Sequence, residues 1–144
     1  YLMNKLLNLV FIASFFLFSC NSNKNFSAEN TEKLTSDTIH ISNPDLEYDV
    51  IIIDGGFTSW FNTYAKPKGF YSQSYLETRN KFWILEWNNR ARNSIQNNSN
   101  LYEMEINYDN TTNYGYNVNY MIYNYLVYFQ LTNKQQLGGF QARL

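Results

Sequence analysis

Side chains that commonly carry out chemistry are scarce in this 144-residue chain. One cysteine and one histidine are too few for a disulfide framework or a zinc site of these residues. The histidine, His40, lies in a polar stretch typical of a linker, so we expect no Ser-His-Asp arrangement. The chain has no glycine-rich phosphate motif, and its net charge of −1 offers no basic field to nucleic acid. The sequence therefore predicts no cofactor, no metal and no nucleic-acid partner.

Carboxylate pairs leave one route to an enzyme open. Glycoside hydrolases use two carboxyl groups, about 5 Å apart in retaining enzymes and farther apart in inverting ones. Such a pair could be drawn from Asp54, Glu86, Glu103, Glu105 and Asp109. Solvated or turn-forming carboxylates explain the same residues. A small carboxylate-dependent hydrolase is thus an alternative, and we favour a protein without enzymatic activity.

Five residues form the candidate ligand site, namely Asp54, Glu86, Trp87, Asn88 and Arg90. Asp54 follows a predicted buried strand, and ligands often bind at such strand ends. The other four lie near the end of a predicted helix, where Glu86 and Arg90 have the i,i+4 spacing of an ion pair. Structural roles compete with both interpretations, because Asp54 can bond turn amides and the ion pair can be an ordinary surface pair.

Cys20 has the sequence context of a lipid attachment site. Lys5 and the apolar stretch 9–18 are typical of a signal peptide, and that stretch is too short to span a bilayer. The residues Leu17-Phe18-Ser19-Cys20 resemble a bacterial lipobox. We therefore expect a signal peptide over residues 1–19, cleavage before Cys20, and acylation of Cys20 with chains such as palmitate, which would anchor the protein to a membrane.

The residues after the signal peptide divide into a tether and a domain. Residues 20–45 comprise the acylated cysteine and a stretch rich in Asn, Ser, Thr and Glu, which predicts a disordered tether. Residues 46–144 then form a single small domain, a length within the usual range for one.

Hydrophobic patterning in the first half of the domain predicts a strand and two helices. The β-branched run 50–53 is typical of a buried strand that ends at Asp54. Apolar residues from 57 to 65 have helical spacing and predict a short helix, which Pro67 ends. A longer helix is expected over 75–92, with Ser74 as its N-cap in a capping box with Glu77.

The second half is predicted to contain a strand and a long helix. Residues 101–109 alternate between apolar and polar side chains, which predicts a half-buried strand. The stretch 116–131 fits both patterns, and its helical spacing favours a helix although its Tyr, Val and Asn content does not. A third strand is expected near 68–73 or after Leu137. The predicted fold class is a small two-layer α/β (α+β) domain in the order strand, short helix, long helix, strand, long helix.

Several short motifs occur in one order along this domain. They are Asp49 to Asp54, then Gly56, Phe57 and Trp60, then Tyr75-Leu76-Glu77 and Asn80, then Glu86-Trp87-Asn88 and Arg90, then Ile106-Asn107-Tyr108-Asp109, then Tyr114-Gly115 and Asn119-Tyr120. Together they resemble an uncharacterised domain-of-unknown-function family of Bacteroidota (flavobacterial) lipoproteins, over about residues 46–133. The resemblance implies an envelope lipoprotein and brings no catalytic residues.

These observations predict a lipid-anchored protein of the cell envelope that acts as an interaction or assembly module. Residues 21–24 lack the dense acids of a surface-export signal, so we expect the periplasmic face of the outer membrane. The expected partners are the membrane, through the lipid, and an envelope protein. Binding of glycan or peptidoglycan through exposed Tyr and Trp is an alternative.

Basic residues are concentrated in one stretch of the domain. Six lie between residues 66 and 92, namely Lys66, Lys68, Arg79, Lys81, Arg90 and Arg92. They could meet anionic envelope polymers or lipid head groups. The net charge near zero favours the other explanation, in which they pair with acids inside the fold.

Overall fold

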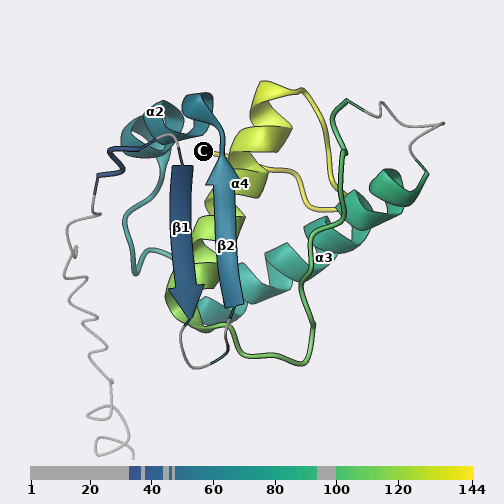
Figure 1. Cartoon of the computed structure of the whole chain (residues 1–144), viewed down its shortest axis with the longest axis horizontal. Coiled ribbons are helices and arrows are strands. Elements are labelled where there is room, and N and C mark those ends of the chain that lie inside the picture. The colour runs from purple at the N-terminus through teal and green to yellow at the C-terminus, as the bar shows by residue number, and fades with distance from the viewer. Residues whose placement is uncertain (1–32, 37, 44–45, 47, 94–99) are drawn as a thin grey trace, which may run out of the picture.

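The computed structural model describes residues 33–36, 38–43, 46, 48–93 and 100–144. Cys20 and the predicted signal peptide lie outside these residues. The described residues form a small mixed α+β domain, which confirms the expected fold class. Its elements are, in chain order, β1 (Thr38–Asn43), β2 (Tyr48–Ile53), α2 (Gly55–Tyr64), α3 (Gln73–Arg92) and α4 (Gly115–Thr132) (Figure 1).

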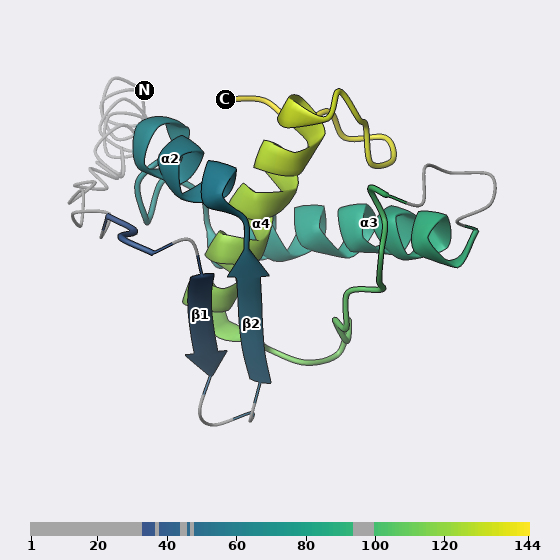
Figure 2. The same ribbon diagram turned by 45° about the horizontal axis from the view of Figure 1, so that its top comes forward.

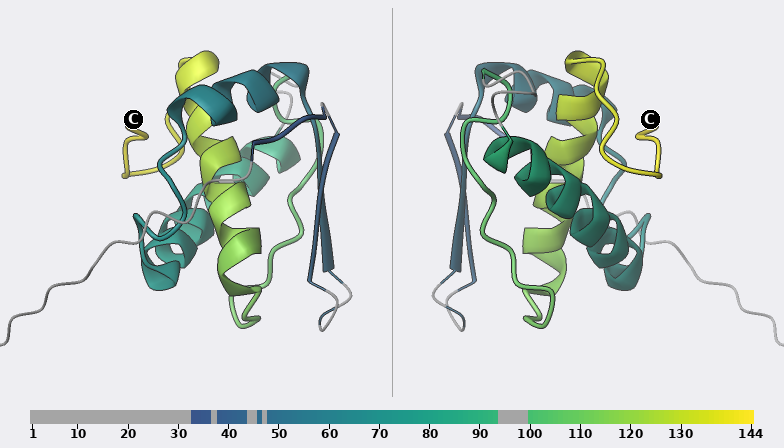
Figure 3. Two further views of the ribbon diagram at one scale, coloured as in Figure 1. Left: turned by 90° about the vertical axis from the view of Figure 1, so that its left-hand side faces the viewer. Right: turned by 90° about the vertical axis from the view of Figure 1, so that its right-hand side faces the viewer.

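Helix α4 lies at the centre of the domain and confirms the helix expected over 116–131. The two-stranded sheet covers one side of it, and α2 and α3 pack against it from other directions (Figures 2 and 3). Its buried Asn119, Asn124 and Gln130 donate to backbone carbonyls one turn earlier, at 2.8, 2.7 and 3.0 Å. Packing thus outweighs the poor helix propensity of this stretch. None of the described helices is both long enough and apolar enough to cross a bilayer.

Strand β1 corrects the predicted boundary between tether and domain. It pairs antiparallel with β2, so that Ile39 lies opposite Ile52 and Ile41 opposite Val50. Ile39 is only 6% exposed. The predicted tether includes 38–43 because residues 20–45 are rich in Asn, Ser, Thr and Glu, but a strand with one solvated face needs apolar residues at every second position only. The ordered domain therefore begins by residue 38, and the start predicted at residue 46 is wrong.

Helix α2 confirms the predicted short helix and starts directly after Asp54. Phe57 and Phe61 are its buried residues. Gly56 allows close packing, because a Cβ at this position would force the hydroxyl of Tyr128 on α4 to move. The start of α2 is therefore seated directly against α4.

Helix α3 ends at Arg92 as predicted but begins with a different cap. Ser72 is the N-cap, and its Oγ accepts a hydrogen bond from the backbone N–H of Tyr75 at 3.3 Å. Ser74 lies within the first turn, so the predicted capping box of Ser74 and Glu77 is wrong. Glu77 instead accepts a hydrogen bond from the side chain of Gln73 at 2.7 Å.

The strand predicted over 101–109 is wrong, because this segment forms neither a strand nor a helix. Met104, placed on the predicted buried face, is 74% exposed, whereas Tyr102 is buried. No strand occurs at 68–73 or over 137–144 either, all of which the structure describes. The second strand of the sheet is β1 instead.

Candidate functional site

The structure places Asp54 at the start of α2, away from the other four predicted site residues. Its Oδ1 accepts hydrogen bonds from the backbone N–H groups of Gly56 and Phe57, at 2.9 and 3.3 Å. It also accepts one from the hydroxyl of Tyr128 at 3.1 Å. Asp54 therefore caps α2 and joins it to α4, as the structural interpretation of this residue expected.

Arg90 connects three parts of the chain. Its guanidinium donates to Glu86 Oε1 at 2.8 Å, to the hydroxyl of Tyr102 at 2.8 Å and to the carbonyl of Gln136 at 2.7 Å. Burial alone would lower the pKa of Arg90, but the hydrogen bonds to Tyr102 and Glu86 outweigh it and the pKa is raised. The predicted ion pair with Glu86 is confirmed, and Arg90 holds the C-terminal segment and the segment 101–109 against α3.

Trp87 and Asn88 hold the segment 101–109 by its backbone. Trp87 Nε1 donates to the carbonyl of Met104 at 2.8 Å. Asn88 donates to the carbonyl of Ile106 at 2.9 Å and accepts from the Ile106 N–H at 2.8 Å. The amide of Asn88 thus satisfies both backbone groups of Ile106, as a neighbouring strand would. Three residues of the predicted ligand site, Trp87, Asn88 and Arg90, therefore position the segment 101–109.

The candidate hydrolase carboxylates are mostly engaged in local contacts. Glu86 pairs with Arg90, and Glu105 pairs with Arg92 at 3.3 Å. Asp109 accepts from the backbone N–H of Thr111 at 2.7 Å. Within the described parts of the chain, no three His, Cys, Asp or Glu side chains gather where they could hold a metal ion. These contacts give structural roles to most of the five candidate hydrolase carboxylates.

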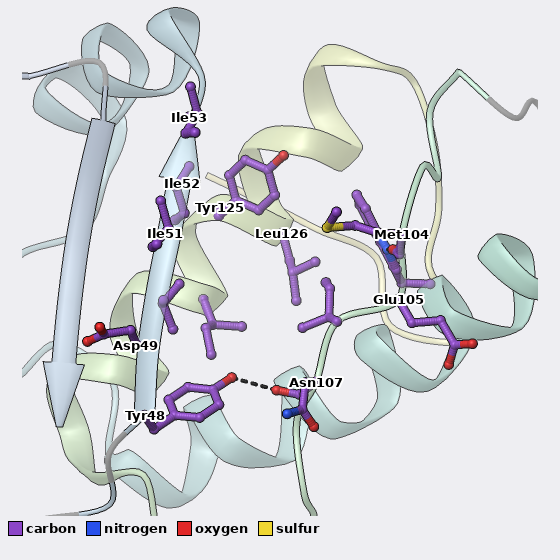
Figure 4. Close-up of a pocket in the computed structure, with 14 residues that line it drawn as sticks. Tyr48, Asp49, Ile51, Ile52, Ile53, Met104, Glu105, Asn107, Tyr125 and Leu126 are labelled. Atoms are coloured by element: carbon purple, nitrogen blue, oxygen red, sulfur yellow. Dashed lines mark hydrogen bonds between the residues drawn. The ribbon is translucent and has the colours of Figure 1, made fainter. Parts of the chain in front are cut away.

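A groove of about 510 Å³ lies between β2 and the segment 104–107 (Figure 4). Its floor includes Ile52 of β2 and Leu126 of α4, both buried. At one end Tyr48 reaches across, and its hydroxyl donates to the carbonyl of Asn107 at 2.6 Å. The groove therefore has an apolar floor, two backbone walls and one closed end.

The edge of β2 that faces this groove carries no backbone pairing within the described chain. Paired strands lie about 4.7–4.9 Å apart, whereas here a whole tyrosine side chain and a hydrogen bond span the gap. The segment 104–107 is held at this distance because α3 binds the backbone of Met104 and Ile106. An edge strand with unpaired backbone groups can add a further strand.

Two acidic residues, Asp49 and Glu105, are among the lining residues, and no lysine or arginine lines the groove. Their side chains point away from the floor: Asp49 is directed towards β1, and Glu105 pairs with Arg92 (Figure 4). Burial, followed by the charge of Asp54, the neighbouring Tyr128 and the charge of Glu103, raises the pKa of Tyr125 to about 12. Tyr125 lines the groove, and its raised pKa keeps the phenol neutral at pH 7.

The isoleucines of β2 are the one sequence feature that points to this groove. The continuous run 50–53 predicted a strand buried on both faces, but Ile51 is 54% and Ile53 is 78% exposed. Only one face of β2 packs on the core. Exposed β-branched residues next to an unpaired edge are typical of a contact surface. Their exposure depends on which elements pack against β2, and the sequence run alone does not show this.

The fold and groove define a small α+β domain with an open strand edge. The chain belongs to a family of unknown function, DUF6146, which matches residues 7–142. The resemblance to an uncharacterised family is thereby confirmed. No curated protein and no solved structure matches the chain.

Proposed function

We propose that this chain is a lipid-anchored protein of the bacterial cell envelope, held by Cys20 at the periplasmic face of the outer membrane. It acts as an interaction module without enzymatic activity. The lipobox-like sequence supports the anchor. The observation that supports the interaction role is the unpaired edge of β2 beside an apolar groove. The groove binds an extended segment of a partner protein.

The bound segment adds to the sheet as a strand beside β2. Its backbone groups pair with the edge of β2, and its alternate side chains point to the groove floor or to solvent. Residues that point inward are apolar, since they meet Ile52, Ile122 and Leu126. The exposed Ile51 and Ile53 extend this apolar contact on the outer face of the sheet.

Charge at the rim defines the partner further. Outward side chains of an added strand lie beside Asp49 on the outer face of β2, and Glu105 lies on the opposite wall. Glu105 is already paired with Arg92, so a basic side chain of the partner fits beside Asp49. The partner segment therefore has apolar residues at its inward positions and beside Ile51 and Ile53, and a basic residue beside Asp49.

Peptide binding to the full chain tests the groove. A valine-rich extended peptide with one central lysine is expected to bind, as measured by calorimetry. The same peptide with glutamate in place of lysine, or with alternate backbone nitrogens methylated, is expected to bind at least about tenfold more weakly, a loss of about 1.4 kcal/mol. Equal binding of the methylated peptide would contradict strand addition.

Charge reversal locates the binding surface. Asp49→Lys is expected to weaken binding of the lysine peptide about tenfold. Glu103→Lys makes the same change at an exposed residue outside the groove lining, so it is the matched control and its effect should be smaller. Equal losses in the two variants would show a general field effect in place of a groove contact.

Metabolic labelling with palmitate tests the anchor separately. The wild-type chain is expected to incorporate the label in a bacterial host and to fractionate with the outer membrane. Cys20→Ser removes the thiol and should abolish both results. Label retained by Cys20→Ser would refute lipidation at this residue while leaving the groove proposal intact.

A further inference from the structure

We infer that a second cleft, built by α3, α4 and the C-terminal segment 136–144, binds an acidic saccharide. The cleft has a volume of about 670 Å³ and shares no lining residue with the β2 groove. It is lined by two arginines, three tyrosines and one tryptophan, namely Arg79, Arg143, Tyr71, Tyr75, Tyr123 and Trp83, together with residues of the C-terminal segment.

Arg79 presents a fixed guanidinium without a carboxylate partner. Its guanidinium carbon lies 3.8 Å from the ring centre of Phe140 and 5.1 Å from that of Tyr75. The ion pairs within the described residues are Arg90–Glu86 and Arg92–Glu105, and neither involves Arg79. Stacking on rings orients the planar donors, which suit a carboxylate in a two-point contact.

The charged side chains that line the cleft are both arginines. Arg143 is exposed and supplies a second guanidinium, and no aspartate or glutamate lines the cleft. Among the residues that the structure describes, the expected internal pairing of the basic stretch 66–92 holds for Arg90 and Arg92 only. Across the described residues, Arg79 has no acidic partner, and an anionic ligand would supply one.

Neutral polar groups around the arginines favour a sugar over a bare anion. Burial first, and then the neighbouring Tyr71 and Tyr75, raises the pKa of Tyr123, so its phenol stays neutral. Gln136 and Gln141 add amide groups. These groups can exchange hydrogen bonds with sugar hydroxyls. The volume also falls within the range of about 300–1,000 Å³ typical of small-molecule sites.

Aromatic rings supply the apolar part of such a site. The rings of Tyr71 and Tyr75 stack at 4.6 Å, and that of Trp83 lies 5.4 Å from Tyr123. Trp83 is 1% exposed and Tyr123 is 6% exposed, so both support the wall from behind. The half-buried rings of Tyr71 and Tyr75 beside the oriented Arg79 match the two features of a uronic acid, an apolar ring face and a carboxylate.

Calorimetric titration of the full chain tests the inference with defined probes. Tetragalacturonate is expected to bind. Its methyl ester, which keeps the sugar rings and loses the charges, is expected to bind at least about tenfold more weakly, as is inorganic phosphate. Absent binding of tetragalacturonate, or equal binding of the ester or of phosphate, would overturn the assignment.

Variants of the two arginines locate the site. Arg79→Gln is expected to weaken tetragalacturonate binding about tenfold, and Arg143→Gln, at an exposed residue whose loss should not affect folding, about threefold. Lys81→Gln removes the same charge from α3 outside the cleft lining, so it should leave the affinity unchanged. A loss in Lys81→Gln equal to that in Arg79→Gln, or no loss in either arginine variant, would contradict the site.

Discussion

The two sides of β2 are held in different ways. On one side β1 pairs with it through the backbone, from Thr38 opposite Ile53 to Asn43 opposite Tyr48. On the other side the segment 101–109 is held by side chains of α3 and leaves a groove. Backbone pairing brings strands within about 5 Å, whereas side-chain hydrogen bonds can hold an extended segment farther away. The same strand therefore has one closed edge and one open edge.

Removal of β1 should have the largest effect, because it takes away the closed edge. A chain beginning at residue 46 loses the buried Ile39 and leaves β2 unpaired. We expect it to show no cooperative thermal unfolding by circular dichroism, while a chain beginning at residue 33 melts like the full chain. Identical melting of the two truncated chains would show that β1 is dispensable.

Asn88→Ala should loosen the segment 101–109 on the other side of β2, with a smaller loss of stability than the removal of β1. It leaves the N–H and the carbonyl of Ile106 without their partner, which should lower the free energy of unfolding by about 2 kcal/mol. Amide exchange at Ile106 should accelerate. Asn89→Ala, at the exposed neighbouring position, is the control and should change little. Unchanged exchange in Asn88→Ala would mean that other contacts hold the segment.

Tyr48→Phe tests the single link across the groove and should lower stability at neutral pH by about 1 kcal/mol. Burial first, and then the neighbouring Tyr114, raises the pKa of Tyr48 to about 12. An unfolded tyrosine ionises near pH 10. The stabilisation is therefore present below about pH 10 and is lost as the pH rises towards 12, and the Phe variant lacks this loss.

Urea unfolding at pH 7 and over the alkaline range measures this difference. The gap in stability between wild type and Tyr48→Phe should narrow above about pH 10. Tyr64→Phe, which alters an exposed hydroxyl of α2, is the matched control at neutral pH. A constant gap across the alkaline range would contradict the role given to the Tyr48 phenol.

Arg92→Gln should have the smallest effect on the segment 101–109. Its pair with Glu105 is about half exposed on both sides, at 53% and 49%, and such pairs contribute roughly 0–1 kcal/mol. Arg90→Gln, two residues earlier, removes contacts to Tyr102 and Gln136 and should lower the free energy of unfolding by about 2 kcal/mol. Urea unfolding measures both losses of stability. Similar losses for the two variants would show that the contacts of Arg90 are no stronger than the Arg92–Glu105 pair.

The helices were largely predictable because their apolar spacing is local. The ranges expected near 57–65, 75–92 and 116–131 correspond to α2, α3 and α4. The cap of α3 was misplaced, because Ser72 and Ser74 are equally suitable in sequence and backbone geometry chooses between them. Asp54 and Arg90 were candidate ligand residues with structural roles as the competing interpretation, and the structure shows structural contacts for both. Their further partners Tyr128, Tyr102 and Gln136 are remote in the chain, so the sequence did not indicate them.

Local patterning by itself determined the class of fold, three helices and one strand, and the sequence context of Cys20 set the expected anchor. Only the tertiary structure decided which extended segments pair. Residues 38–43 and 101–109 both alternate, yet the first forms β1 and the second does not. Strand pairing depends on which remote partners meet, and here Trp87 and Asn88 on α3 take up backbone groups of Met104 and Ile106, which therefore do not pair with β2. The open edge and the groove are consequences of that competition.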